Sequence, residues 1–298
     1  MPWPVRRLRA PVNSCCGRFD AVRRADPVGE AAIQATWRYL SNLKGWDILV
    51  FRDSLEGSCT ERIAAAAQAS GFLTRRESDR PNPYVRIPGN VEGLAKMPPN
   101  PKLRSQLRQA RRRLAEHGTI KFTRLETAAR SALDRFYQLE ASGWKGRIHS
   151  CVLHDGSQSF YDEIAGSAAR AGYFSLYMLE LNDQLLAAHL SLTHRGICYS
   201  PKVAYNEEFR QFAPGHLIVA EIMKDCAARG IYAFDITGQD QDWKMKWTSE
   251  TRPITHHYIF RGPIGRLAHD VGIRLKSSLK TLLKGDGRQS RIVCIPEN

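Results

Sequence analysis

The spacing of apolar residues divides most of the chain into alternating helices and strands. Helical spacing predicts helices over 31–43, 59–70, 102–116, 128–143, 159–172 and 216–229. Apolar runs predict strands over 46–51, 119–125, 173–181, 185–193, 196–205, 231–237 and 255–260. The polar triplet 182–184 suits a hairpin turn. We therefore expect an α+β fold in which helices flank a mixed, mostly antiparallel sheet.

Prolines mark the expected domain boundary. Residues 78–101 contain six prolines and predict a strand followed by a crossover linker. We expect residues 30–100 to form a small α/β unit with this linker, and residues 101–262 to form the main domain. Residues 1–29 are rich in Arg and Pro and show no periodicity, which predicts a disordered basic arm.

Positive charge is concentrated rather than spread along the chain. The 44 Lys and Arg residues exceed the 30 Asp and Glu residues by 14. The segments 1–24, 102–113 and 261–284 hold 18 of the basic residues and only two acids, so the remainder is nearly neutral. The arginines of 102–113 could contact a nucleic-acid backbone, but a basic helix without interleaved aromatics is more often a solvated face.

The C-terminal segment 263–298 is expected to contain a basic amphipathic helix over 264–284. Its leucines recur on one face beside Lys and Arg, so it either packs on the domain or contacts an anionic membrane surface. No window approaches the ~18 apolar residues that a membrane-spanning helix needs. The seven scattered cysteines and the lack of a secretory signal favour a cytoplasmic location.

The sharpest local pattern is the strand, loop and helix over 196–229. The loop Arg210-Gln-Phe-Ala-Pro-Gly215 leads directly into a helix N-terminus, where free N–H groups and the helix dipole bind anions such as a pyrophosphate. Pro214 suits the first helical turn, and Gly215 would let a ligand approach the backbone closely. An ordinary strand-to-helix connection is the alternative.

This loop resembles the coenzyme A pyrophosphate loop of the GNAT acyltransferase superfamily through its spacing Arg210-x-x-Ala213-x-Gly215. The surrounding sequence resembles the CelD-type branch, whose members are often described as BioF-like acetyltransferases. The matching stretches are 102–114, 139–147, 202–208, 212–215 and 235–247. That branch is related to the Fem peptidoglycan aminoacyltransferases, which carry two GNAT units in tandem. The resemblance therefore implies a GNAT domain preceded by an incomplete second GNAT-like unit.

The resemblance implies an acyl-CoA-dependent N-acyltransferase that uses acetyl-CoA or another acyl-CoA as co-substrate. Its acceptor would be an amine on a small molecule or saccharide, with a role in polysaccharide biosynthesis, such as cellulose biosynthesis, or in cell-envelope biosynthesis. Two alternatives stay open. The first is a catalytically silent interaction module in exopolysaccharide synthesis. The second is a Fem-like transfer from charged tRNA, the one case in which we expect a nucleic-acid partner.

The resemblance also implies site residues. Coenzyme A is expected along Arg210, Gln211, Phe212, Ala213, Pro214, Gly215 and His216. The reaction needs a base for the amine and an acid for the thiolate. The candidate catalytic groups are Glu207 as base, Tyr205 as acid or positioning hydroxyl, and Lys244, because Trp243 stands where many relatives have the tyrosine acid. The candidate substrate contacts are Trp144, Lys145, Arg147, Lys202 and Asp240.

No metal site is expected. His256 and His257 are adjacent on a predicted strand and so face opposite sides. The chain has neither an HExxH motif nor a Cys/His ligand cluster.

Overall fold

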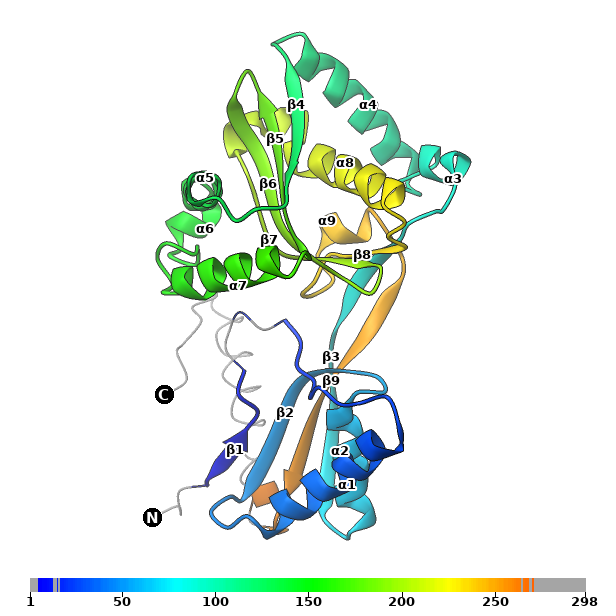
Figure 1. The fold of residues 1–298 in the computed structure, drawn as a ribbon, viewed down its shortest axis with the longest axis vertical. Helices are drawn as coiled ribbons and strands as arrows, with labels where there is room; N and C mark the ends of the chain where they lie inside the picture. The colour runs from blue at the N-terminus through cyan, green and yellow to red at the C-terminus, as the bar shows by residue number, and fades with distance from the viewer. Residues whose placement is uncertain (1–4, 13–14, 16, 264, 268–269, 271–298) are drawn as a thin grey trace, which may run out of the picture. The chain divides into compact units, whose positions relative to one another are not determined.

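The structure, a computed structural model, describes residues 5–12, 15, 17–263, 265–267 and 270. Contacts divide the chain into two compact units (Figure 1). Unit 1 takes its residues from 1–79 and 254–298, and unit 2 comprises residues 80–253. Strands β3 (Leu73–Arg86) and β9 (Thr251–Phe260) each run from one unit into the other.

Unit 1 is a small sheet covered by two helices. Its strands lie in the order β1, β2, β9, β3. The helices begin at side-chain caps, because Asp26 accepts from the Gly29 N–H and Ser58 accepts from the Glu61 N–H. Buried apolar side chains of both helices and of β2 and β9 form its core. The bounds are β1 (Arg7–Arg9), α1 (Pro27–Asn42), β2 (Ile48–Leu55) and α2 (Cys59–Ala69).

The sheet of unit 2 has its strands in the order β3, β8, β7, β6, β5, β4. Neighbours from β4 to β7 are antiparallel, and β7 and β8 are parallel. The turn between β5 and β6 uses Asn182 and Asp183 with φ of 48° and 65°, which is the backbone of a tight hairpin. The bounds are β4 (Ile120–Leu125), β5 (Phe174–Leu181), β6 (Gln184–His194), β7 (Ile197–Tyr205) and β8 (Ala233–Asp235).

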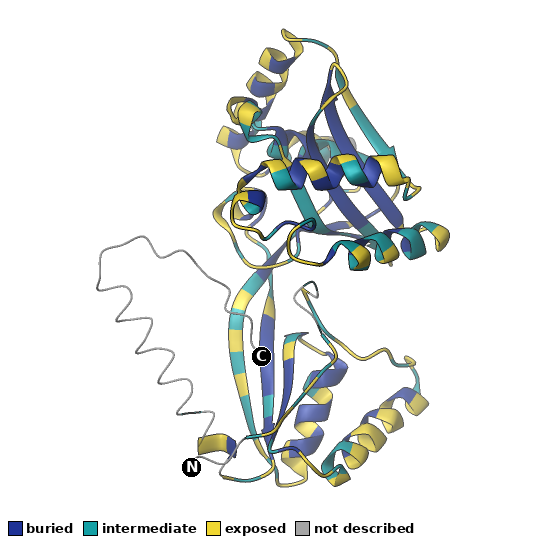
Figure 2. Cartoon of the chain, turned by 90° about the vertical axis from the view of Figure 1, so that its left-hand side faces the viewer, coloured by how far each residue is buried: buried dark blue, intermediate teal, exposed yellow. Residues whose placement is uncertain are grey.

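Helices cover both faces of this sheet, so β5 is buried along its whole length (Figure 2). Helix α8 packs on one face with α4 beside it, and α5 and α7 cover the other face (Figure 1). The bounds are α3 (Val91–Ala95), α4 (Pro101–Ala115), α5 (Arg130–Ser142), α6 (Trp144–Arg147), α7 (Gln158–Arg170), the 3-10 helix η1 (Glu207–Phe212), α8 (Pro214–Ala228) and α9 (Asp242–Met245).

The expected α+β class is confirmed, but the expected boundaries need correction. Unit 2 begins at Arg80 rather than at 101, because the end of β3 pairs with β8. It ends at Pro253 rather than at 262, because the rest of β9 pairs with β2 of unit 1. Unit 1 is therefore discontinuous in sequence.

The expected disordered arm over 1–29 is also corrected in part. Residues 7–9 form β1, which pairs in parallel with β2, and Leu8 packs on the core of unit 1. Three residues are too few to give a periodic signal. The C-terminal helix expected over 264–284 lies mostly outside the described residues. Within the described part of the chain, no helix has the length and hydropathy needed to cross a membrane.

Candidate active site

A cavity of about 590 Å³ lies in unit 2 where β7 and β8 separate. The two strands pair only from Ile197 to Tyr199 on β7, and beyond this point the gap between them is not closed by backbone hydrogen bonds. Side chains of α5 and α6, the start of α8 and the segment 236–244 complete the walls. Ten of the predicted site residues line it: Trp144, Lys145, Tyr205, Glu207, Arg210, Ala213, Pro214, Gly215, His216 and Lys244.

The backbone of β7 presents to this cavity N–H groups for which no described residue supplies a backbone acceptor. The Asn206 N–H donates to the Leu186 carbonyl of β6 at 2.7 Å. Because peptide groups alternate in direction along a strand, the N–H groups of Val203 and Tyr205 face the other way, toward the open edge. The Val203 carbonyl indeed accepts from Lys145 Nζ at 2.8 Å on this side. The open edge thus offers donors for an oxyanion.

The start of α8 forms the outer end of the cavity. Ala213 caps the helix in the left-handed conformation, with φ of 48° and ψ of 49°. The N–H groups of His216 and Leu217 both donate to the Ala213 carbonyl, and Pro214 has none. Among the described residues, no acceptor binds the Gly215 N–H, which is therefore available to an anion together with the helix dipole and exposed Arg210.

Lys244 is the buried cation on the opposite wall. It is 6% exposed, and its Nζ donates to the carbonyls of Thr237 at 2.5 Å and Gln239 at 3.0 Å. Burial lowers the pKa of the Lys244 ammonium to about 8. At neutral pH it is mostly protonated and able to give up a proton easily.

Glu140, which the sequence analysis did not single out, is central to the inner wall. Its side chain is fully buried and binds Lys145 at 2.8 Å and Lys202 at 3.3 Å. Its other oxygen accepts from the Val152 N–H at 2.8 Å. Burial lowers the pKa of Lys145. The predicted contact Lys202 is thus a partner of Glu140 rather than a lining residue.

Two neutral histidines also line the cavity. Burial lowers the pKa of His189 to about 3, and its Nδ1 lies 2.8 Å from the Ser200 hydroxyl. Burial lowers the pKa of His216 to about 4. The indole N–H of Trp247 donates to His216 Nδ1 at 2.9 Å, so the His216 proton is on Nε2. His216 therefore acts as a neutral donor at this site.

Glu207 is held by partners that weaken it as a base. It accepts from the Trp144 N–H and from Arg147, both at 2.8 Å. The hydrogen bond from Arg147 lowers the pKa of Glu207. Glu207 thus fixes the start of α6 against η1. Trp144 keeps 48% of its surface exposed at the cavity wall.

The remaining predicted residues lie outside the cavity. Arg147 and Gln211 line a separate shallow surface hollow with Asn206 and Glu208. Phe212 is buried in the core of unit 2 against His117 and Arg113, so only its backbone could face a ligand. Asp240 pairs with Arg80 at 3.3 Å.

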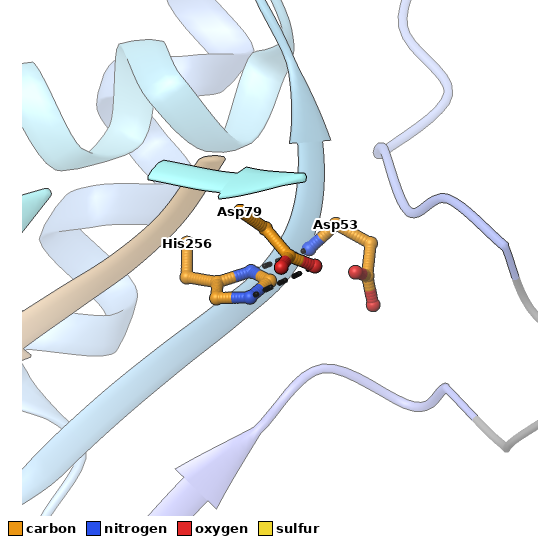
Figure 3. A group of neighbouring side chains, drawn as sticks. All are labelled: Asp53, Asp79 and His256. Carbon is orange, nitrogen blue, oxygen red and sulfur yellow. Dashed lines mark hydrogen bonds and ion pairs between the residues drawn. The ribbon is translucent and has the colours of Figure 1, made fainter. Parts of the chain in front are cut away.

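One group in unit 1 has the composition of a metal site. Asp53, Asp79 and His256 each offer a possible ligand atom, and these atoms lie within 4.8 Å of one another (Figure 3). Among the described residues, no other group of three or more His, Cys, Asp or Glu residues meets this criterion. His256 Nδ1 accepts from the Asp53 backbone N–H at 3.1 Å, so the imidazole proton is on Nε2, which lies 3.7 Å from Asp79. Because Nε2 carries the proton, this geometry favours an interaction of His256 with the Asp79 carboxylate over coordination of a metal by Nε2. The absence of a metal stays a prediction.

Comparisons with known proteins bear on the fold that carries this cavity. Residues 101–245 match the family model described as acetyltransferase (GNAT) domain. None of the curated proteins matches the chain. The solved structure of FemX is similar with a TM-score of 0.58 and 15% identity, over 90% of this chain and 83% of FemX. The C-terminal domain of a putative lysylphosphatidylglycerol synthetase from Agrobacterium fabrum gives a TM-score of 0.55 at 12% identity, over 82% of this chain and 76% of that one. At these identities the likeness establishes the fold alone.

Proposed function

Because residues 101–245 carry a GNAT acetyltransferase domain, we propose that the protein is an acyl-CoA-dependent N-acyltransferase. The observation that carries the proposal is one cavity that joins the start of α8 to the open edge of β7. The stretches that resemble the CelD-type branch support a role in polysaccharide or cell-envelope biosynthesis, with an amine on a small molecule or saccharide as acceptor.

We expect a coenzyme A thioester to lie along this cavity. Arg210, the Gly215 N–H and the dipole of α8 suit the pyrophosphate at the outer end. From there the open edge of β7 runs inward and offers the N–H groups of Val203 and Tyr205 to a carbonyl oxygen. The thioester supplies an activated acyl carbon. The helix start offers few donors, so we expect modest affinity for the pyrophosphate.

The reaction would form a C–N bond and break the C–S bond. The acceptor amine attacks the carbonyl carbon, and the β7 N–H groups stabilise the oxyanion. Lys244, whose pKa is lowered to about 8, then gives its proton to the departing thiolate, and thiols such as that of cysteine have a pKa of about 8.5. The amine releases its own proton to solvent at the mouth of the cavity. Tyr205, whose ring lies against Gly215, positions the thioester arm.

Calorimetry with coenzyme A and thiol release from acetyl-CoA test this proposal. We expect binding in the wild type and an affinity at least tenfold lower, about 1.4 kcal/mol, in Gly215→Val. A side chain there would begin 3.4 Å from the Tyr205 ring and cover the free N–H. The matched control is Gly166→Val on α7, which adds the same side chain to a helix away from the cavity.

Absence of measurable binding at millimolar coenzyme A would reject the cofactor assignment. Binding without thiol release across a broad amine panel would favour a catalytically silent module instead.

Aminoacyl transfer from tRNA is the second candidate, and helix α4 is the observation that bears on it. Arg108 and Arg112 are exposed and make no ion pair with any described residue. The other arginines of α4 are engaged within unit 2: Arg104 with carbonyls, Arg111 with Glu221 and Arg113 with the Phe212 ring. Lys102 is likewise exposed and makes no ion pair with a described residue. Three such cations make a small phosphate contact surface, so we expect weak tRNA binding that salt abolishes.

A further inference from the structure

The inner end of the cavity carries more positive than negative charge. Lys145, Lys202 and Lys244 are three ammonium groups, and Glu140 is the carboxylate that binds two of them. Lys145 and Lys244 are both connected to β7. Lys145 donates to the Val203 carbonyl of this strand. Lys244 donates to the Thr237 carbonyl, and the Thr237 hydroxyl in turn donates to the Ser200 carbonyl of β7.

Other carboxylates near this region do not cancel the excess. Asp235 is fully buried and paired with Arg252, and Asp240 is paired with Arg80. Glu207 at the outer end is paired with Arg147. Each of these acids therefore already has its own cation, and the excess charge at the inner end persists.

Both lining lysines also have a donor to spare. An ammonium group carries three N–H bonds. Lys145 uses two of them on Glu140 and Val203, and Lys244 uses two on Thr237 and Gln239. Among the described residues, no oxygen or nitrogen accepts the third N–H of either group, and the Trp243 ring centroid lies 5.7 Å from Lys244 Nζ. Lys244 is buried and Lys145 is partly buried, so a ligand atom that accepts from either group is favoured.

We infer that the acceptor carries an acidic group, a carboxylate or a phosphate, beside its amine, and that this group binds between Lys145 and Lys244. The inference rests on the proposed function and specifies its acceptor class. The hydroxyl groups of an unmodified amino sugar could accept from these donors, but any neutral acceptor would leave the positive charge uncompensated.

With a carboxylate bound, one positive charge remains among these groups, and it helps to activate the amine. Positive charge nearby disfavours the ammonium form of the acceptor and lowers its pKa. The bound acceptor therefore loses its proton to solvent more readily than it does in water. This is consistent with a site in which Glu140 and Glu207 are both held in ion pairs.

The direct test is anion binding to the protein saturated with coenzyme A, which occupies the outer end. Tryptophan fluorescence reports on the cavity because Trp144 and Trp243 line it. We expect sodium phosphate or sodium acetate to give a saturable change that sodium chloride at matched ionic strength does not give. Comparison of the two salts identifies the preferred acid group. Lys145→Met should weaken this binding at least fivefold, and the matched control Lys102→Met, on the exposed face of α4, should not.

In the Lys145→Met variant, Glu140 keeps Lys202 and the Val152 N–H as partners, so we expect the variant to fold. A melting curve checks this. If it unfolds, Glu140→Gln/Lys145→Met replaces it, because that pair removes both charges together. Absence of saturable phosphate and acetate binding, or binding that survives the loss of Lys145, overturns the inference.

Turnover gives the second measurement. In pairs that differ only in the acid group, such as phenylalanine with 2-phenylethylamine and glucosamine 6-phosphate with glucosamine, the acidic member should have at least tenfold higher kcat/KM. Preference for the neutral members would overturn the acceptor class while leaving the acyltransferase intact. Failure to bind coenzyme A would instead reject the proposed acyltransferase function. Anion binding that depends on Lys145 could still be measured in the absence of coenzyme A.

Discussion

Lys244 is the residue whose chemistry can be tested most directly. Its Nζ is held by two carbonyls inside the cavity. If it protonates the thiolate, Lys244→Met should lower kcat at least tenfold, about 1.4 kcal/mol, and leave the affinity for coenzyme A unchanged. Calorimetry and thiol release measure the two effects separately. Unchanged turnover would show that Lys244 only supports the loop around Gln239.

The pH dependence follows from the same group. Burial lowers the pKa of Lys244 to about 8, and only the protonated form can donate. Its contribution to kcat should therefore be complete below pH 7 and fall as pH rises through 8. We expect a descending limb near pH 8 in the wild type that is absent from Lys244→Met. A wild-type profile that only rises to pH 9.5 would contradict the proton-donor role.

At this scale the sequence predicted residues on several walls of the cavity but missed Glu140. The start of α8 was foreseeable because the loop 210–215 has a recognisable spacing and sits next to a periodic helix. Glu140 was not, because a glutamate within a helix normally indicates a solvated face. Its burial depends on Lys202, a partner on another element, and no local pattern shows that pairing.

The entry into α8 has visible backbone strain. Ala213 has φ of 48°, a conformation that costs a residue with a Cβ about 1 kcal/mol or more and costs glycine none. Ala213→Gly should therefore raise the free energy of unfolding by roughly 1 kcal/mol, measured by urea denaturation. The same change at Ala227, inside α8, should lower it by about 1 kcal/mol. Destabilisation by both substitutions would mean that the strain at Ala213 is already relieved.

Elements with strong periodicity were predicted well, and short ones were not. The hairpin of β5 and β6 and the helices α4 and α7 lie within a few residues of their expected bounds. Helix α6 was not predicted from the sequence, since four residues are little more than one turn and show no stripe. Its position depends on Glu207, which binds the Trp144 N–H from η1.

Over the whole molecule, β9 links the stability of unit 1 to the C-terminal part of the chain. Ile259 is fully buried in the core of unit 1 with Trp37 and Phe51. Ile259→Ala should lower the free energy of unfolding by about 3 kcal/mol, and Ile259→Val by about 1 kcal/mol. Hydrogen exchange should show faster exchange in β2 and little change in β5. Equal acceleration in both strands would mean that the two units unfold as one.

The discontinuity of unit 1 also determines the order in which the protein can fold during synthesis. Ile48 pairs with Phe260, and all of unit 2 is encoded between them. At about 5–20 residues per second, β2 leaves the ribosome roughly 10 to 40 s before its partner strand is made. Unit 2 is contiguous and can fold in that interval. The buried faces of α1 and α2 lack their complete sheet throughout it, which makes the first part of the nascent chain the segment that most needs chaperone protection.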